Sequence, residues 1–263
     1  MKTYLNIAIK SAVEAGIAIL AIYEEEVEVA LKADKSPLTA ADLASNRVIN
    51  AYLKETDIPV ISEENRQHPW SERRTWKRCW VVDPLDGTKE FIKKNGEFTV
   101  NIAICEDQAP VLGVIYVPVT RELYYAEVAD GKAYKTVLAK DHSIPDKLFS
   151  DTDAIQPGKS ENGSLRIVGS RSHMNEDTLN YIDSMRGDYK EVDIVSKGSS
   201  LKFCLVAEGK ADVYPRFAPT MEWDTAAGHA ICKAVGLKVT SRQTQNELQY
   251  NKEDLLNPYF LVE

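Results

Sequence analysis

The chain has 263 residues and a formal net charge of −8, from 32 basic and 40 acidic side chains. Its 44% hydrophobic and 27% charged residues are ordinary for a globular protein and exclude a disordered chain, a collagen or a small disulfide scaffold. The acidic excess argues against a general binder of nucleic-acid polymers, which needs a basic face. A small phosphorylated substrate stays compatible, because acidic side chains can gather metal cations that then hold phosphate.

The first half is expected to contain two helices followed by a run of strands. Apolar residues recur every three or four positions over 3–24, which predicts a helix with one buried face. After a polar loop over 32–37, Thr39 or Asp42 is expected to cap a second helix that runs to about Glu55. The expected strands are 27–31, 59–61, 80–82, 98–105, 111–118, 123–128 and 133–136.

Residues 139–164 are polar and rich in proline and glycine, which is typical of a linker. Beyond them, helices alternate with strands. The expected strands are 165–168, 189–195, 211–214, 237–240 and 258–262, and the expected helices are 176–185, 199–208 and 223–235. This order predicts a mixed α+β and α/β fold. We expect one unit over 1–263, with an N-terminal α+β half (1–140) and a C-terminal α/β half (165–263).

The four cysteines show no Cys-x-x-Cys spacing, so we expect buried free thiols rather than a zinc or redox motif. The amphipathic start lacks the pattern of a signal peptide, and the uncharged stretch 108–120 is too short to span a bilayer. These features predict no transmembrane segment and a cytoplasmic location. Peripheral association with the cytoplasmic face of the inner membrane stays open, and so does the oligomeric state.

The segment 81–88 is the strongest chemical signal in the sequence. A short apolar strand ends abruptly in Asp83 and Asp86, with a proline and a glycine that set a tight turn. Such a turn can direct both carboxylates and the carbonyl of Leu85 at one point, with Thr88 just beyond. Oxygen ligands of this kind suit Mg²⁺. When the segment 81–88 is considered by itself, a turn that binds no metal is an equally weighted alternative.

Two further acidic segments have a similar setting. Glu63 and Glu64 follow a short apolar strand, and adjacent carboxylates repel each other unless a cation or solvent screens them. Asp224 stands at the expected start of a helix and is followed by small residues that allow close packing. Taken alone, Asp224 is more simply interpreted as a helix N-cap.

Taken in order, the segments 63–64, 83–88 and 223–228 resemble the signature of the inositol monophosphatase superfamily. That resemblance implies a layered α-β-α-β-α sandwich of the type shared with fructose-1,6-bisphosphatase, and a Mg²⁺-dependent, lithium-sensitive phosphomonoesterase. It extends over essentially the whole chain. The segments that resemble the bacterial 3′(2′),5′-bisphosphate nucleotidase branch are 32–42, 88–92, 96–103, 170–173 and 198–209.

The resemblance implies a set of metal ligands. Glu63, Asp83 and the carbonyl of Leu85 are expected to hold one Mg²⁺. Asp83, Asp86 and Asp224 are expected to hold a second, with Asp83 bridging the two ions. A third, weaker ion would depend on Glu63. Metal ions in such sites lower the pKa of a bound water and neutralise charge on phosphate oxygens.

The resemblance also implies the catalytic groups. Asp42 and Thr88 are expected to form a hydrogen-bonded pair that orients and deprotonates the attacking water, and Glu64 to help orient that water. For Asp42, a carboxylate in the first turn of a helix is a compatible structural explanation. The backbone amides of Gly87 and Thr88 can donate to phosphate oxygens at the turn.

Recognition of a nucleotide is expected to depend on the second half. Ser199 and Lys202 lie three residues apart at the start of an expected helix and so share a face. With Arg216 and His173, they are expected to bind the 5′-phosphate. A surface lysine is the alternative for Lys202, and His229 is interpreted as a packing residue. The substrate is also expected to contact Glu63, Leu85, Asp86, Gly87, Thr88 and Asp224.

The resemblance thus implies hydrolysis of the 3′-phosphate of adenosine 3′,5′-bisphosphate (PAP) to AMP and phosphate. Its sulfated precursor PAPS, which would give adenosine 5′-phosphosulfate (APS), is a second candidate substrate. Both reactions belong to sulfate assimilation and PAP recycling. The alternative is an inositol monophosphatase or another sugar-phosphate phosphatase. A non-catalytic nucleotide sensor is disfavoured, because the expected metal ligands and the Asp42–Thr88 pair are present.

Overall fold

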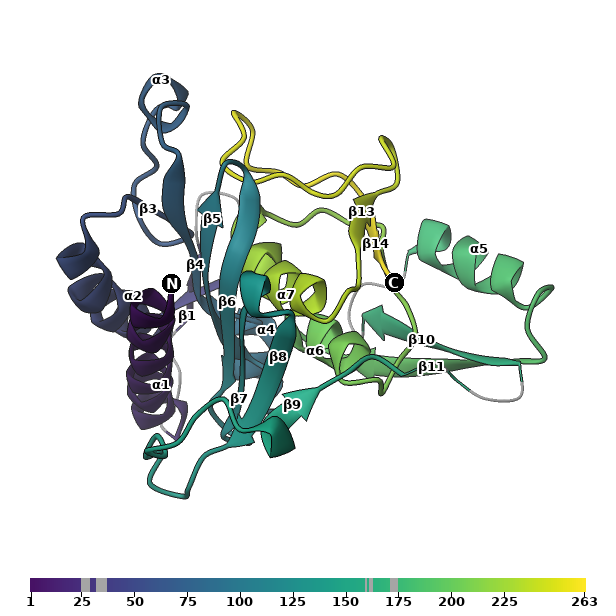
Figure 1. The fold of residues 1–263 in the computed structure, drawn as a ribbon, viewed down its shortest axis with the longest axis horizontal. Coiled ribbons are helices and arrows are strands. Elements are labelled where there is room, and N and C mark those ends of the chain that lie inside the picture. Colours follow the sequence, from purple (N-terminus) through teal and green to yellow (C-terminus); the bar gives the residue numbers. More distant parts are fainter. Residues whose placement is uncertain (25–28, 32–36, 159, 161–162, 171–174) are drawn as a thin grey trace.

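The computed structural model describes residues 1–24, 29–31, 37–158, 160, 163–170 and 175–263 (Figure 1). The helices are α1 (Lys2–Tyr23), α2 (Ala40–Leu53), α3 (Trp70–Arg73), α4 (Thr88–Ile92), α5 (Glu176–Met185), α6 (Leu201–Ala207) and α7 (Glu222–Ala234). The strands are β1 (Val29–Leu31), β2 (Pro37–Thr39), β3 (Val60–Ser62), β4 (Arg78–Asp86), β5 (Thr99–Glu106), β6 (Ala109–Val117), β7 (Glu122–Glu127), β8 (Lys132–Val137), β9 (Ala154–Ile155), β10 (Ser164–Ser170), β11 (Glu191–Lys197), β12 (Tyr214–Arg216), β13 (Val239–Ser241) and β14 (Phe260–Val262).

The largest sheet in the described part of the chain has seven strands in the order β3-β4-β5-β6-β7-β8-β9. Strand β3 is parallel to β4, and all other neighbours in this sheet are antiparallel. Short hairpin connections join β5 to β6, β6 to β7 and β7 to β8, whereas residues 87–98, which contain α4, connect β4 to β5. Strand β4 lies inside the sheet: residues 80–82 pair with β3 on one side and β5 on the other, whereas Asp83 and Asp86 pair with β5 alone.

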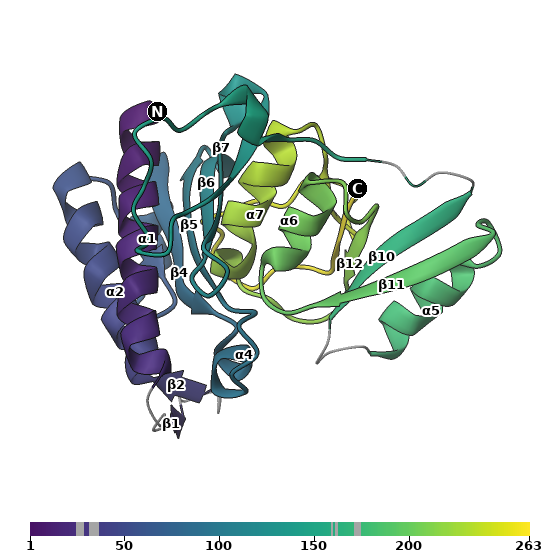
Figure 2. The same ribbon diagram turned by 90° about the horizontal axis from the view of Figure 1, so that it is seen from below.

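Different helices cover the two faces of this sheet, as Figure 2 shows. Side chains alternate along β4, so Trp80 and Val82 pack in the same cluster as α1, whereas Val81 packs on the side of α7. In β6, a Cβ at Gly113 would lie 2.4 Å from the carbonyl oxygen of Ala227. Helix α7 therefore packs directly on the backbone of the sheet.

A second β layer lies beyond α6 and α7. It consists of a three-stranded sheet in the order β12-β14-β13 and of the parallel pair β10–β11, and a single bridge between Ile167 and Val213 joins them. Helix α5 packs on the outer side of this layer (Figure 2). Helices α1 and α2, the large sheet, α6 with α7, the second β layer and α5 form five layers. The expected α-β-α-β-α sandwich is confirmed.

Most expected elements are present within a few residues of their predicted bounds. Thr39 is the N-cap of α2 and Asp42 its third residue, and each caps the other's backbone as in a capping box, so both candidates for this helix start take part. The strand expected at 27–31 is described only from Val29 onward. The loop expected at 32–37 lies almost entirely outside the described residues.

Three local expectations were wrong. Helices α3 and α4 were not predicted, because four or five residues are too few to show a helical period. The strand expected at 211–214 is displaced to β12, since Val213 makes only a single bridge to Ile167 before regular pairing begins at Tyr214.

Helix α1 is the one helix in the described residues that is long and apolar enough to cross a membrane by length and composition. Its buried side chains, among them Leu5 and Ile9, belong to the core cluster that packs on the large sheet. A core helix passes the same test of length and composition. The four cysteines are buried and free, as expected.

Candidate active site

The end of β4 carries the central acidic turn. The pairing between β4 and β5 shifts register between Asp83 and Asp86, so the chain bulges there and both carboxylates face one side. The backbone N–H of Leu85 donates to Asp83 Oδ1 at 3.0 Å, and the hydroxyl of Ser45 on α2 donates to the carbonyl of Pro84 at 2.6 Å. These bonds fix the turn locally and against a neighbouring helix.

Asp224 reaches the same place from the first turn of α7. One carboxylate oxygen from each of Asp83, Asp86 and Asp224 lies within 4.8 Å of the other two. Asp224 Oδ2 also accepts the N–H of Met221 at 2.8 Å, which caps the helix. The residue is therefore a helix cap and a member of the acidic cluster at once.

Burial and mutual repulsion raise the pKa values of this cluster. Burial is the main reason why the pKa of Asp83 lies well above its usual range, and Glu63, Asp86 and Asp224 raise it further. Burial, followed by the charge of Asp86, raises the pKa of Asp224 to about 7. Several carboxylates gathered in a buried place are costly without a compensating positive charge. This all-oxygen donor set therefore fits a divalent cation such as Mg²⁺.

Glu63 joins the cluster from β3. Its N–H donates to the carbonyl of Val82 at 3.2 Å, which extends the parallel pairing and brings the segment beside the acidic turn. The sequence did not reveal what supports this segment. Side-chain hydrogen bonds support it. The amide of Asn46 donates to Asn65 Oδ1 at 3.0 Å, and the hydroxyl of Ser62 donates to Asn46 Oδ1 at 3.2 Å.

Asp42 and Thr88 meet although 46 positions separate them in the sequence. The hydroxyl of Thr88 lies 3.3 Å from Asp42 Oδ1 and 3.4 Å from the carbonyl of Leu85. Asp42 is buried, and its other oxygen accepts the N–H and the hydroxyl of Thr39, each at 2.7 Å. These two bonds to Thr39 fix the orientation of the Asp42 carboxylate.

Gly87 is required for the turn between β4 and α4. Its φ of 95° lies in the left-handed region, and a Cβ there would lie 3.2 Å from the carbonyl oxygen of Glu97 and 3.3 Å from Ser199 Cβ. A side chain at this position would therefore be strained and would crowd the approach of the second half to the acidic turn.

The second half reaches the acidic turn through the segment before α6. The hydroxyl of Ser199 donates to Asp86 Oδ2 at 2.8 Å, and the N–H of Ser200 donates to the same oxygen at 2.6 Å. Ser199 has a φ of 55°, so it precedes the helix rather than lying in its first turn as expected. Its hydroxyl points back to a carboxylate of the first half.

Lys202 is only 5% exposed, so the alternative of a surface lysine is wrong. Its ammonium donates to the carbonyl of Ser199 and lies 5.6 Å from the centre of the Tyr214 ring. Burial lowers its pKa to about 8, against the opposing effect of the negative charge of Asp86. A buried cation beside the acidic cluster is suited to hold an anionic group of a ligand.

Arg216 ends β12 on the same side as Lys202. Its Nη2 donates to the carbonyl of Pro219 at 3.2 Å, whereas its buried Nε has no hydrogen-bond partner among the described residues. His173 lies outside the described residues. His229 is fully buried and contacts the hydroxyl of Tyr250 at 3.0 Å, which confirms it as a packing residue.

A cavity of about 340 Å³ unites these groups. Its lining includes the predicted site residues Glu63, Asp83, Leu85, Asp86, Gly87, Thr88, Ser199, Lys202, Arg216 and Asp224. Asp42 and Glu64 are not in the lining; Asp42 contacts it through Thr88. Sequence reasoning did not assign Glu90, Tyr214, Pro219 and Thr220 to the site, although all four line the cavity and Glu90 lies in the segment 88–92 that carries the resemblance.

The family model described as the inositol monophosphatase family matches residues 1–262. The chain belongs to this family. Solved structures with sequence identities of 21–23%, among them an inositol monophosphatase from Thermotoga maritima with a TM-score of 0.74, share the fold.

More similar relatives carry a more specific name. The chain is 47% identical over 252 residues to the 3′(2′),5′-bisphosphate nucleotidase CysQ of Salmonella typhimurium, which covers 94% of each chain. It is 46% identical to the CysQ of Escherichia coli K12, again over 94% of each chain. The crystal structure of CysQ from Bacteroides thetaiotaomicron, at 48% identity, covers 100% of this chain and 97% of its own, with a TM-score of 0.89.

Proposed function

We propose that this chain is a 3′(2′),5′-bisphosphate nucleotidase that hydrolyses the 3′-phosphate of PAP to AMP and phosphate. The observation that carries the proposal is the composition of one cavity. A cluster of carboxylates forms one wall, and the buried cation of Lys202 with the guanidinium of Arg216 forms part of the other. Such a cavity suits a ligand with two separate phosphates: one held through cations on the carboxylates, the other held by basic side chains.

The proposed cation ligands follow the acidic cluster. Glu63, Asp83 and the carbonyl of Leu85 would hold one Mg²⁺, and Asp83, Asp86 and Asp224 would hold a second. A third ion, where present, depends on Glu63. Bound Mg²⁺ supplies an activated water and neutralises charge on the phosphate. The close approach of the Asp83, Asp86 and Asp224 oxygens supports the second of these sites.

The protein's own catalytic groups handle the proton of the attacking water. Thr88 donates its hydroxyl proton to Asp42, so its oxygen is left to accept a hydrogen bond from that water. As the new P–O bond forms and the ester P–O bond breaks, the water's proton passes through Thr88 to Asp42, and the leaving 3′-oxygen takes up a proton from solvent. Glu64 helps to orient the water.

The remaining contacts hold the nucleotide. The amides of Gly87 and Thr88 donate to the 3′-phosphate, and Lys202 and Arg216 bind the 5′-phosphate together with Ser199 and His173. We propose that Glu63, Leu85, Asp86 and Asp224 also contact the substrate, directly or through the bound ions. In this proposal residues 1–263 act as one catalytic unit, whose halves (1–140 and 165–263) contribute the cation site and the nucleotide site.

PAPS is the second proposed substrate, because it differs from PAP only by a sulfate on the 5′-phosphate. Either reaction places the chain in sulfate assimilation or PAP recycling, in the cytoplasm. A sugar-phosphate phosphatase is the alternative function within the family. The nucleotide is favoured because relatives named for bisphosphate nucleotides are 46–48% identical over nearly the whole chain, whereas the inositol monophosphatases cited above reach 21–23%.

A panel of phosphate esters tests the proposal. Phosphate release from PAP, PAPS, inositol 1-phosphate and fructose 1,6-bisphosphate would be measured with Mg²⁺, with a chelator, and with Mg²⁺ plus Li⁺. We expect Mg²⁺-dependent release that is fastest from the nucleotides and is inhibited by Li⁺. A tenfold preference for the inositol ester would overturn the substrate. Nucleotide binding without Mg²⁺-dependent release would indicate a sensor instead.

A further inference from the structure

Three hydroxyl groups form a buried chain behind the carboxylate of Asp86. The oxygen of Thr99, the first residue of β5, lies 2.6 Å from Ser199 Oγ and 2.8 Å from Ser200 Oγ. The hydroxyl of Ser199 in turn contacts Asp86 Oδ2 at 2.8 Å. Thr99 is fully buried and does not line the cavity. No sequence motif predicted a role for it.

The number of protons available fixes the direction of the hydrogen bond between Ser199 and Asp86. A hydroxyl has one proton to donate, and an ionised carboxylate can only accept. Ser199 therefore donates to Asp86, and the single proton of Thr99, whose oxygen also lies 3.1 Å from Asn101 Oδ1, goes either to Ser199 or to Asn101. Thr99 in turn accepts from Ser200, or Ser200 donates to Asn101 Oδ1 at 2.7 Å. The hydroxyl of Ser199 thus points toward Asp86, and Thr99 connects Ser199, Ser200 and Asn101 into one network. Hydrogen bonds connected in this way strengthen one another.

The hydrogen bonds that Asp86 accepts from the described residues reach only one of its two carboxylate oxygens. Oδ2 accepts from Ser199, from the N–H of Ser200 at 2.6 Å and from the amide of Asn101 at 3.3 Å. Every hydrogen bond that Asp86 accepts from the described residues ends on this oxygen. Oδ1 is therefore the oxygen available for a cation, and the bonds on Oδ2 fix the direction in which it points.

The same contacts fix the segment that precedes Lys202. Ser199 adopts a left-handed φ of 55°, which is unfavourable for a residue with a Cβ. On the other side of Ser199, the N–H of Gly198 donates to Glu97 Oε2 at 2.9 Å. The carbonyl of Ser199 accepts the ammonium of Lys202. A change in the position of Ser199 would therefore move Lys202 as well.

We infer that Thr99 is a positioning residue that couples the cation ligand Asp86 to the substrate-binding segment 198–202. The inference rests on the proposed function for the roles of Asp86 and Lys202. Without the hydroxyl of Thr99, Ser199 loses a hydrogen-bond partner, and Asp86 and Lys202 are no longer held by one connected set of bonds. Thr99 therefore affects cation affinity and nucleotide affinity together, although it touches neither ligand.

The test compares Thr99→Val, which removes the hydroxyl and keeps the shape, with Thr99→Ser, which keeps the hydroxyl. Thr136→Val is the matched control, because Thr136 is also a buried threonine of the large sheet and donates at 2.7 Å to Asp153, away from the cavity. Mg²⁺ binding to chelator-treated protein and AMP binding in saturating Mg²⁺ would be measured by calorimetry, and the KM for PAP by phosphate release. Neither calorimetric measurement requires turnover.

We expect Thr99→Val to weaken Mg²⁺ binding about tenfold, the lower range for groups that orient metal ligands, and to raise the KM for PAP and the Kd for AMP. Thr99→Ser should restore both affinities to within about twofold of the wild type. Thr136→Val should lower the melting temperature and leave both affinities unchanged. If Thr99→Val does not fold, Ser200→Ala, which removes the next hydroxyl of the chain, provides the same comparison.

Unchanged Mg²⁺ affinity in a folded Thr99→Val variant would overturn the inference, and so would a loss that Thr99→Ser fails to restore. Equal losses in Thr136→Val would also overturn it, because they would indicate general destabilisation. Failure of the proposed function is a separate result. It would show as wild-type protein that binds Mg²⁺ but releases no phosphate from PAP.

Discussion

The two walls of the cavity are built in different ways. The cation wall centres on Asp83 and Asp86, at the end of one interior strand of a seven-stranded sheet. Asp83 accepts a bond from Leu85 within the turn, whereas Asp86 accepts its bonds from Ser199, Ser200 and Asn101. The nucleotide wall comes from Lys202 and Arg216, which lie in short elements of the second half and donate to carbonyls three residues away, those of Ser199 and Pro219. Local structure positions the side chains that lie within one turn, whereas side chains from several elements are positioned by how those elements pack.

Helix α7 joins the two walls. It follows the linker in sequence, yet it packs on the large sheet of the first half and contributes Asp224 to the cation cluster. Glu222, two residues before Asp224, is fully buried and accepts the ammonium of Lys252 at 2.6 Å and the N–H of Asn251. These bonds anchor the start of α7, so the position of Asp224 depends on tertiary contacts, as that of Asp86 does.

The largest expected effect removes a ligand from the cation wall. Asp86→Asn should lower kcat for PAP at least about a thousandfold, which corresponds to about 4 kcal/mol of lost transition-state stabilisation. The chelator-treated variant should keep its melting temperature, because the substitution removes one charge from a cluster of mutually repelling carboxylates. The rise in melting temperature on adding Mg²⁺ should be lost. Steady-state kinetics and thermal unfolding measure these effects.

Asp107→Asn is the matched control, an exposed aspartate in a hairpin turn whose φ of 47° asparagine also tolerates. It should change neither activity nor the response to Mg²⁺. Preserved activity in Asp86→Asn would mean that the cation wall has been misassigned.

The contact between α7 and the sheet can be broken at Gly113. Alanine there would place Cβ 2.4 Å from the carbonyl oxygen of Ala227 and 2.8 Å from Ala230 Cβ, so α7 must move. We expect a loss of about 1–3 kcal/mol in the free energy of unfolding, as for other overpacked sites, and weaker Mg²⁺ binding because Asp224 moves with the helix. Denaturant unfolding and Mg²⁺ titration measure the two effects.

Gly187→Ala is the control for the glycine substitution. Its Cβ would lie 3.5 Å from the nearest atom, the carbonyl oxygen of Ser184, and its backbone needs no left-handed conformation. It should be neutral or slightly stabilising. If Gly113→Ala kept full Mg²⁺ affinity, the position of Asp224 would not depend on this packing.

The nucleotide wall is tested at Lys202. Lys202→Ala should raise the KM for PAP about tenfold, which is the size of one lost charged hydrogen bond, and spare hydrolysis of a simple phosphate ester. The pKa of Lys202 is about 8, so its ammonium is lost as the pH rises through that value. The KM of the wild type should therefore rise between pH 7 and pH 9.

Lys202→Arg separates this titration from other causes, because a guanidinium stays charged in that range. The alkaline rise in KM should be absent in this variant. Equal losses on PAP and on the simple ester in Lys202→Ala would contradict a role in binding the 5′-phosphate.

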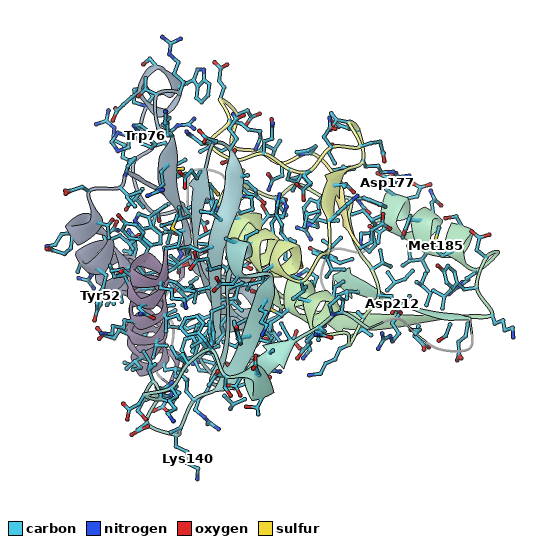
Figure 3. All side chains as sticks on the ribbon, viewed as in Figure 1. Tyr52, Trp76, Lys140, Asp177, Met185 and Asp212 are labelled. Carbon is cyan, nitrogen blue, oxygen red and sulfur yellow. The ribbon has the colours of Figure 1, made fainter. Side chains whose placement is uncertain are left out.

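The smallest expected effect concerns an ion pair far from both walls. Asp212, which Figure 3 labels near β10 and β11, binds the guanidinium of Arg166 at 2.8 Å. Burial alone would raise the pKa of Asp212, but hydrogen bonds from Arg166 and Ser160 outweigh it and lower that pKa to about 2. Because the folded pKa is the lower one, the stabilisation is complete above about pH 4 and is lost as the pH falls toward 2.

Asp212→Asn should therefore lower the free energy of unfolding by about 1 kcal/mol at pH 7, given that solvent screens such a pair. The difference from the wild type should shrink between pH 4 and pH 2, while kcat and KM at neutral pH stay unchanged. A change in KM of the size expected for Lys202→Ala would show that the outer β layer also shapes the nucleotide wall. Urea unfolding at several pH values measures the stability.

Much of the fold was predictable, because long elements leave periodic patterns. The apolar repeat over 3–24 predicted α1, and alternation predicted β5 to β8. Short elements such as α4 leave no such pattern. Within the site, Asp83 and Asp86 were recognisable because both lie in one strand-ending turn. The burial of Lys202 was not, because a lysine at the start of a helix is usually exposed.

The sequence by itself indicated the candidate oxygen ligands and their order, because Asp83 and Asp86 lie in one turn after an apolar strand and the order of the acidic segments resembles a known family signature. Only the tertiary structure decided which partners surround them. Ser199 and Asp86 are 113 positions apart, and Thr99, which contacts the hydroxyl of Ser199, is 100 positions from it in the sequence. Contacts of this kind arise from the packing of whole layers, and no local pattern in the chain records them.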